Sequence, residues 1–143
     1  MNNCLLCHSS FRREINYEKL FLFVKYKERY TCSECLKKFV KKKGKICSGC
    51  NKEINTEGLC NDCLKWKQKY AGNLLDNRSL YQYNDTFHDV MVQYKRYGDY
   101  ILCHVLAELI DQLPAADYYV PVPSSPSHLE KRGFDTVCAI YQK

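Results

Sequence analysis

Eight of the ten cysteines in this sequence stand in pairs, with two residues between the partners of each pair. A C-x-x-C turn presents two thiolates to one side of a metal ion, and two such turns complete a tetrahedron with metal–sulfur distances of about 2.3 Å. Four pairs therefore predict two closed structural zinc sites, with disulfides or an iron–sulfur cluster as the weaker alternatives. The pairs are Cys4/Cys7, Cys32/Cys35, Cys47/Cys50 and Cys60/Cys63.

The pairs can combine in two ways, either consecutively or with the first pair joined to the third and the second to the fourth. The consecutive scheme is favoured because the stretch NKEINTEGL between Cys50 and Cys60 suits a short hairpin, with Gly58 available at its turn. The longer interval before Cys32 contains LFLFVKYKERYT, which has strand propensity and predicts a longer hairpin. His8 adjoins Cys7, but four thiolates already satisfy a zinc ion, so we interpret it as a surface histidine or one that supports a ligand.

The composition is that of a globular protein, with 45% hydrophobic and 27% charged residues in a chain of 143. The longest apolar run, LFLFV, is far too short to span a bilayer, and the first residues do not have the pattern of a secretory signal. We therefore expect a cytoplasmic protein without membrane insertion, in which thiols stay reduced and favour metal over disulfides. Cys103 and Cys138 stand alone among apolar neighbours and are predicted to be small core residues.

Positive charge is concentrated in the first half of the chain. Residues 1–70 hold 16 Lys/Arg and 7 Asp/Glu, a balance of +9, whereas residues 71–143 hold 6 and 9, a balance of −3. The segment SECLKKFVKKK predicts a short helix whose remaining surface is basic, through Lys37, Lys38, Lys41, Lys42, Lys43 and Lys45.

A lysine run of this kind is either a solvated helix face or a surface that attracts the phosphates of nucleic acid. Aromatic residues lie close to it in the sequence, and single strands are held by such a mixture of stacking and charge. Single-stranded DNA is therefore a candidate ligand of this region. The aromatic residues are Tyr26, Tyr30, Phe39, Trp66 and Tyr70.

The second half predicts an α/β arrangement with a parallel crossover. RSLYQY (78–83) and YYVPVP (118–123) have strand patterns, the latter of a buried type, and helical patterns cover 86–97, 100–113, 126–133 and 134–143. The stretch VPVPSSP would lie at the carboxyl end of a strand, where backbone N–H groups and the hydroxyls of Ser124 and Ser125 could meet an anion. Lys131 and Arg132 follow about two turns along the next helix. The alternative is an ordinary strand-to-helix turn.

The ordered set of four C-x-x-C pairs, YNDTFHDVMVQYKRYGDY and PVPSSPSHLEKRGF resembles the ComF family. The resemblance implies a double zinc ribbon over 1–70 and a type I phosphoribosyltransferase-like domain over 71–143. It places Val122, Pro123, Ser124 and Ser125 in a pyrophosphate loop, with Lys131 and Arg132 in the R-G-F region that follows. It also matches Lys95, Gly98 and Asp99 to a Y-K-x-x-G-D stretch without an assigned chemistry.

The resemblance implies a competence protein that handles incoming single-stranded DNA during natural transformation. A competence helicase or a recombination mediator is a possible partner of the zinc ribbons. Two further hypotheses are a transferase that uses phosphoribosyl pyrophosphate with Mg²⁺, and a zinc-ribbon module that binds proteins.

The sequence also departs from the family pattern. His128 stands where the family often has a basic residue, and Asp135-Thr136 replace the usual Asn-Gln. The later Asp-Asp-x-x-T-T-G-A-T signature, which contacts the ribose and the 5-phosphate, does not occur in this sequence. We therefore expect an N-terminal fragment that is inactive as a transferase by itself, with Mg²⁺ and phosphoribosyl pyrophosphate bound only by a full-length relative.

Overall fold

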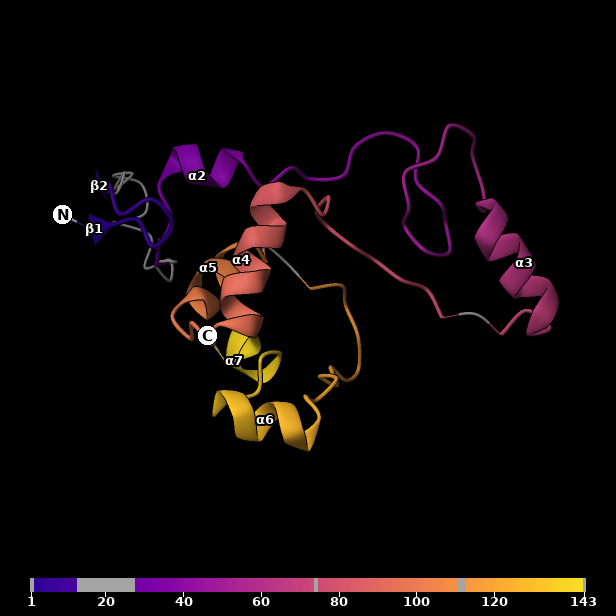
Figure 1. Cartoon of the computed structure of the whole chain (residues 1–143). Helices are drawn as coiled ribbons and strands as arrows, with labels where there is room; N and C mark the ends of the chain where they lie inside the picture. Colours follow the sequence, from indigo (N-terminus) through magenta and orange to yellow (C-terminus); the bar gives the residue numbers. More distant parts are fainter. Residues whose placement is uncertain (1, 13–27, 74, 111–112, 143) are drawn as a thin grey trace. The chain divides into compact units, whose positions relative to one another are not determined.

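The computed structural model describes residues 2–12, 28–73, 75–110 and 113–142 (Figure 1). The chain divides into two compact units, which are described separately below. Unit 1 comprises Met1–Lys38 and Asp85–Lys143, and unit 2 comprises Phe39–Asn84. This division follows packing and differs from a boundary after residue 70, so the predicted domain limits stay a prediction.

The amino-terminal part of unit 1 is a small hairpin followed by a short helix. Strand β1 (Asn2–Asn3) pairs antiparallel with β2 (Ser10–Phe11), and helix α2 covers Ser33–Lys37. Most of the predicted hairpin LFLFVKYKERYT lies outside the described residues.

The helix predicted for SECLKKFVKKK ends at Lys37, well before Lys43. Beyond it, in unit 2, the carbonyl of Val40 accepts from the Gln82 amide and the Lys42 amide donates to Leu80. This pairing with a distant segment holds residues 40–42 extended, so they cannot continue the helix.

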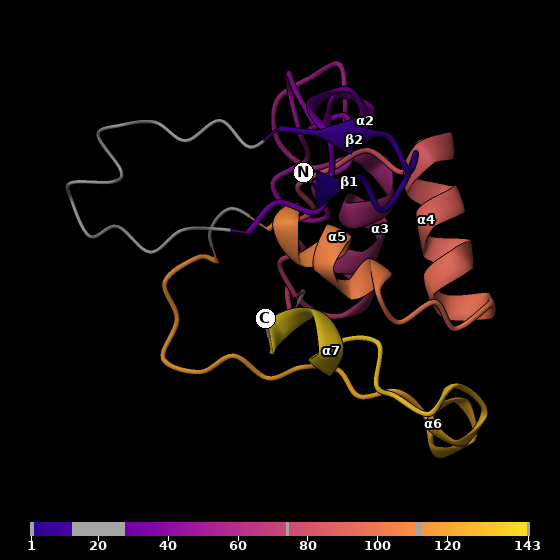
Figure 2. The ribbon, with the colours of Figure 1, turned by 90° about the vertical axis from the view of Figure 1, so that its left-hand side faces the viewer.

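The remainder of unit 1 is mostly helical. Helix α4 covers Asp85–Arg96, α5 Leu102–Glu108, α6 Pro126–Arg132 and α7 Cys138–Tyr141. Helix α5 packs against both α4 and α7 (Figures 1 and 2). Gly98, at φ +73°, permits the turn that separates α4 from α5. The side chains buried by this packing are Val90, Tyr94, Leu102, Cys103, Val105, Leu106 and Ala139.

Cys103 is fully buried, as predicted, and Cys138 is half-buried. The predicted helix over 100–113 is shorter, because α5 ends at Glu108, and α7 begins only at Cys138. Among the described residues no helix combines the length and the apolar character needed to cross a bilayer.

The prediction of a buried strand over 118–123 is wrong. This segment has no strand conformation, and Tyr118 and Val120 are 86% and 84% exposed. A strand needs a neighbour that accepts and donates its backbone hydrogen bonds, and the only sheet among the described residues is β1–β2. The region after the cysteine clusters is therefore mostly helical where it is described, and a phosphoribosyltransferase-like sheet stays a prediction.

Unit 2 contains one regular element, helix α3 (Asn61–Lys69), among its described residues. Isolated bridges join Ile46 to Glu53 and Lys41 to Tyr81. The predicted strand over 78–83 is thus reduced to one bridge, because only residues 40–42 lie beside it. The hydrophobic cluster of unit 2 consists of the buried Cys47, Cys60 and Cys63, with Ile54 and Leu59 packed against them, and Phe39 is also buried.

Candidate metal centres and basic surface

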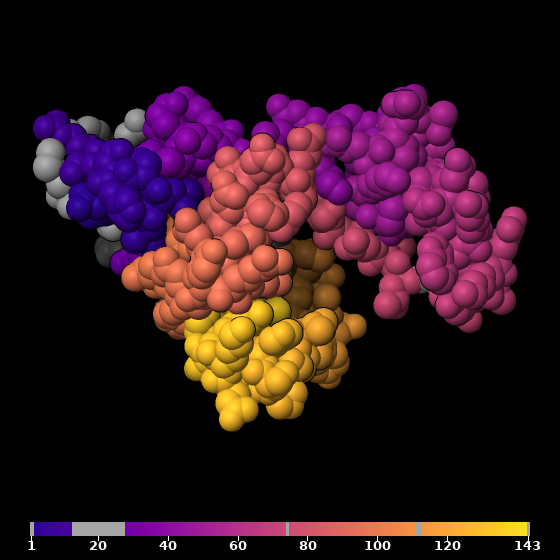
Figure 3. Space-filling view, in the orientation of Figure 1, coloured from indigo at the N-terminus to yellow at the C-terminus, as the bar shows by residue number. Residues whose placement is uncertain are grey.

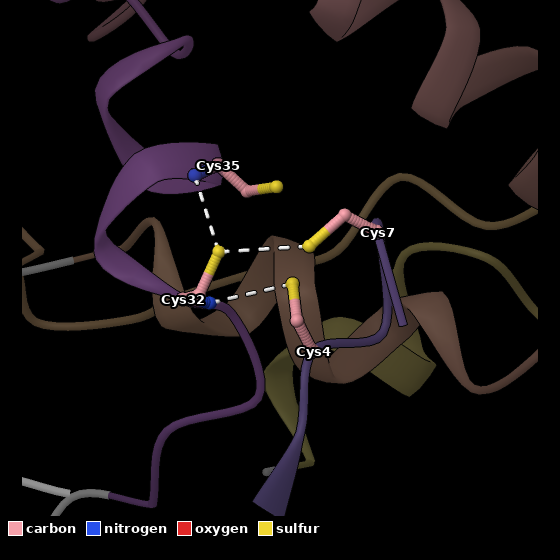
Figure 4. A group of neighbouring side chains, drawn as sticks. All are labelled: Cys4, Cys7, Cys32 and Cys35. Atoms are coloured by element: carbon pink, nitrogen blue, oxygen red, sulfur yellow. Dashed lines mark hydrogen bonds between the residues drawn. The ribbon is translucent and has the colours of Figure 1, made fainter. Parts of the chain in front are cut away.

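The first candidate centre gathers four sulfur atoms in unit 1 (Figure 4). The Sγ atoms of Cys4, Cys7, Cys32 and Cys35 all lie within 4.8 Å of one another, and those of Cys7 and Cys32 are 3.7 Å apart. A tetrahedral site with metal–sulfur distances of about 2.3 Å separates its sulfurs by roughly 3.8 Å. A disulfide would need about 2.05 Å. The spacing therefore fits four thiolates around one metal ion.

Backbone hydrogen bonds shape this group. The Cys4 amide donates to Ser9 O and the His8 amide to Cys4 O, both at 2.9 Å, which folds Cys4–Cys7 into a tight turn. His8 adopts a left-handed conformation at φ 59° to complete it. The second pair opens a helix, because Cys32 is the N-cap of α2 and its sulfur accepts from the Cys35 amide. The Cys32 amide in turn donates to Cys4 Sγ at 3.3 Å.

The second centre repeats this arrangement in unit 2. The sulfurs of Cys47, Cys50, Cys60 and Cys63 again lie within 4.8 Å of one another, with 3.7 Å between Cys50 and Cys60. The Cys47 amide donates to Lys52 O and the Asn51 amide to Cys47 O, matching the first turn bond for bond. Cys60 occupies the N-cap position of α3 without a side-chain cap hydrogen bond, and its amide donates to Cys47 Sγ at 3.2 Å.

The residue that follows the first C-x-x-C pair has the same backbone conformation in both centres. Asn51, at φ 60°, occupies the place that His8 has in the first centre. His8 is exposed and belongs to neither group of four sulfurs. His8 contributes the left-handed backbone conformation that closes the first turn. Asn51 has the same conformation in the second centre, and asparagine adopts it readily.

Each centre combines one thiol that ionises easily with one that resists ionisation. Hydrogen bonds from Ser9 lower the pKa of Cys7 to about 6, and amides of Cys50 and Cys60 lower the pKa of Cys47 to about 6. Burial raises the pKa of Cys63 to about 12 and also raises that of Cys35. Four thiolates in such surroundings need a cation to compensate their charge, so each group could bind a metal ion. The eight cysteines are grouped in the consecutive scheme.

The predicted lysine surface does not form one helix face. Lys37 and Lys38 belong to unit 1, where Lys37 pairs with Glu34 at 2.8 Å. In unit 2, Lys45 lies 3.7 Å from Glu57, and Lys43 is exposed. Positive charge is therefore partly compensated along this run.

Two further lysines of the run are held by neighbours within unit 2. The half-buried Lys42 donates to Asn51 O and Ser79 Oγ, both at 2.7 Å, beside an open groove of about 460 Å³. The ammonium of Lys41 lies 5.9 Å from the centre of the Tyr81 ring. The groove is lined by Cys50, Lys52, Asn77, Gln82 and Tyr83 among other residues.

The aromatic residues predicted near the basic run divide into two kinds. Phe39 is buried, and Tyr30 packs against His104 at 4.3 Å between ring centres. Trp66 and Tyr70 instead stack on each other at the surface of α3. Tyr26 lies outside the described residues. Sequence reasoning did not select Lys69, although its spacing of three residues after Trp66 places both on one face of a helix.

The proposed pyrophosphate-loop residues are exposed at Val122, Pro123 and Ser125, and half-buried at Ser124. The Ser124 amide donates to Asp135 Oδ2 at 2.6 Å. Asp135 Oδ1 also accepts from the Val137 and Cys138 amides, and these bonds hold the pKa of Asp135 well below its ordinary value. An amide expected to face an anion is therefore engaged by the chain's own carboxylate.

Lys131 and Arg132 occupy the last turn of α6, which ends at Gly133 in a left-handed conformation. The YKRYGDY stretch and the residues that follow Gly133 are in contact. Phe134 lies 5.5 Å from the Tyr94 ring and 5.0 Å from the Tyr100 ring, and Tyr94 donates from its hydroxyl to Thr136 O. The YKRYGDY stretch thus contributes packing to the segment after α6.

Comparison with known proteins supports one relationship. The chain is 31% identical over 140 residues to competence protein ComFC of Bacillus subtilis and 30% identical over 138 residues to competence protein ComFC of Streptococcus pneumoniae. These matches cover 92% and 94% of the chain but 58% and 60% of the relatives, so the chain spans about 60% of their length. No family model and no solved structure matches. The chain is a homologue of competence protein ComFC over that region.

Proposed function

We propose that this chain is a competence protein that binds single-stranded DNA during natural transformation through a region organised by two zinc ions. The observation that carries the proposal is its similarity over more than nine-tenths of its length to proteins named for competence. Zinc is the metal proposed because two closed groups of four thiolates are typical of its structural sites.

Charge and aromatic surface support DNA as the ligand. Of the chain's 22 Lys/Arg, 16 lie in residues 1–70, which also contain both cysteine groups. Cationic side chains attract phosphates without regard to sequence, and exposed aromatic rings stack on unpaired bases. Lys43, Trp66 and Tyr70 are exposed among the described residues and supply both kinds of contact.

Transferase activity has weaker support in this chain. The Ser124 amide donates to Asp135, so an incoming pyrophosphate would have to compete with a carboxylate of the same protein. Binding of a competence helicase or a recombination mediator is compatible with DNA binding and stays a prediction.

The test is a titration of the zinc-loaded chain into a fluorescently labelled oligothymidine, followed by anisotropy. We expect binding that weakens as salt rises, because each phosphate contact releases about one counterion, with a slope near −0.7 per contact for single strands. An equal titration with duplex DNA measures the preference for single strands.

Two results would contradict the proposal, namely no binding at low salt, or binding that is indifferent to salt. A paired control separates the lysines. Lys43→Gln removes an exposed charge, whereas Lys37→Gln removes one already paired with Glu34. The first change is expected to weaken binding about two- to three-fold, on the order of one phosphate contact, and the second to weaken it less.

A further inference from the structure

Helix α3 carries an aromatic pair at its surface. Trp66 and Tyr70 are one turn apart, with ring centres separated by 5.4 Å and planes inclined by only 12°. Each of the two residues is 48% exposed. In Figure 3 residues of α3, in magenta, are visible at the surface of unit 2. A pair of partly exposed rings on a polar helix is suited to a ligand that stacks on aromatic side chains.

The surroundings of the two rings are positively charged. The Lys69 ammonium lies 5.3 Å from the centre of the Trp66 ring and 5.5 Å from that of Tyr70. Lys65 and Lys67 are exposed on the same helix. Asp62, the acidic residue of α3, lies in its first turn and pairs with Lys52 at 3.5 Å. The last turn is therefore cationic, which favours an anionic ligand over an apolar protein surface.

We propose that Trp66, Lys69 and Tyr70 form a base-stacking site for single-stranded nucleic acid. An unpaired base offers a flat π-face to the exposed part of the aromatic pair, and the adjoining phosphate meets Lys69. Base pairs in a duplex are already stacked on both faces, so the site selects single strands and tolerates any sequence. This inference rests on the proposed function and assigns the residues that would carry it.

The second cysteine group positions this site. Cys60 stands at the N-cap position of α3, and Cys63 lies in the first turn of the helix, one turn before Trp66. A metal ion held by these sulfurs would fix the start of the helix, and the rings would follow at a set distance. This dependence explains why a metal centre and a nucleic-acid site occur in so small a unit.

The chain contains a single tryptophan, so its fluorescence reports on this site alone. The experiment titrates the full zinc-loaded chain with oligothymidine and, separately, with an abasic oligomer of equal length. Anisotropy of a label on the oligomer measures affinity in the same samples. We expect quenching of Trp66 by oligothymidine and much less by the abasic oligomer, since the sugar-phosphate backbone alone cannot stack.

Variants then separate stacking from helix stability. Trp66→Ala is expected to weaken oligothymidine binding about ten-fold or more, and Trp66→Phe to retain most of the affinity because a ring remains. Leu64→Ala is the matched control, since Leu64 is 47% exposed on the same helix but has no ring. Lys69→Gln should weaken binding less and lower the salt slope by about one contact.

Three outcomes would overturn the inference. If the chain binds oligothymidine while Trp66 fluorescence and the affinity of Trp66→Ala are unchanged, DNA binds elsewhere and only the proposed function survives. If the abasic oligomer quenches equally, the contact is to phosphate and no base stacks. If no oligomer binds, both proposals fail. Zinc content of each variant is measured alongside, so that loss of the fold is not mistaken for loss of the site.

Discussion

The two cysteine groups share the hydrogen bonds of their first turn but have very different surroundings. In both, a C-x-x-C turn closes through a left-handed residue, and the second pair opens a helix. The first group belongs to a unit with an apolar core of its own, formed by α4, α5 and α7. In the second unit the buried cluster is made of the cysteines themselves, with Ile54 and Leu59 beside them.

Helices α2 and α3, which follow the two groups, also differ in how they are connected to the rest of their units. The chain just before α2 is tied to α5, because Glu108 accepts from the Tyr30 amide at 3.1 Å and lies 3.5 Å from Arg29. Helix α3, by contrast, presents Leu64, Trp66 and Tyr70 about half exposed. The first cysteine group is thus attached to a folded apolar core. The second cysteine group instead lies at the start of α3, a helix with an exposed surface.

The largest difference should appear when one ligand of each group is removed. Cys47→Ser should unfold unit 2, because metal binding worth about 10–16 kcal/mol in small zinc modules is what stabilises its core. Cys4→Ser should lose one metal but leave α4 and α5 folded on their apolar contacts. Elemental analysis should fall from two zinc ions to one in each variant, while amide exchange becomes fast throughout residues 39–84 only in Cys47→Ser. Amides that stay protected in residues 39–84 of Cys47→Ser would contradict the dependence of unit 2 on its metal ion.

The tie between the first group and α5 should come next in size. Glu108→Ala leaves the Tyr30 amide without this acceptor and Arg29 without this carboxylate, in a place where the Glu108 side chain is only 7% exposed. We expect a loss of about 2 kcal/mol in the free energy of unfolding of unit 1. Urea denaturation followed by circular dichroism measures it.

Glu108→Gln is the control for this prediction, because the amide oxygen can still accept from Tyr30. It should cost less than the alanine change. Equal losses in the two variants would show that packing, and not the hydrogen bond, makes the connection.

A smaller effect should distinguish the two turns. A Cβ atom at Gly49 would lie 3.1 Å from Leu59 Cδ2 and 3.2 Å from Cys63 Sγ, so Gly49→Ala crowds the second centre. The corresponding position of the first turn is Leu6, where a side chain is already accommodated. We expect Gly49→Ala to destabilise unit 2 by about 1–2 kcal/mol. Competition with a chromogenic chelator should show faster zinc release from one of two sites, whereas Leu6→Ala should leave both release rates nearly unchanged.

A pH-dependent effect is expected from Asp135, which belongs to unit 1. Its pKa is lowered by amides of Cys138, Ser124 and Val137, so the ionised carboxylate stabilises the fold. That contribution is complete above the ordinary value of 3.8 and is lost as the pH falls below it towards the lowered pKa. The stability difference between the wild-type chain and Asp135→Asn should therefore shrink below about pH 4. Metal release in acid affects both chains equally, and a difference that does not change with pH would contradict the role of the charge.

Residue types and local spacing were sufficient to predict the cysteine groups and helices α4 and α6. A C-x-x-C pair carries its chemistry within four residues, and α4 has an apolar stripe that indicates the period of a helix. The end of α2 at Lys37 could not be read locally, since it depends on the pairing of residues 40–42 with residues 80–82.

Long-range partners also explain the other differences. Strand propensity at 118–123 has no effect where no neighbouring strand is found among the described residues. The hydrogen bond from the Ser124 amide to Asp135 joins residues eleven apart. It occupies an amide that the local sequence predicts to be available to an anion. The Trp66–Tyr70 pair was present in the sequence as two aromatic residues, but only the helix brings Lys69 beside both rings.

The most direct test of this account is zinc X-ray absorption on the purified, reduced chain, with elemental analysis of the same sample. The account predicts two zinc ions per chain, each surrounded by four sulfur atoms at about 2.3 Å and by no nitrogen or oxygen. Fewer than two metal ions, or a first shell that includes lighter atoms, would contradict the two four-thiolate centres.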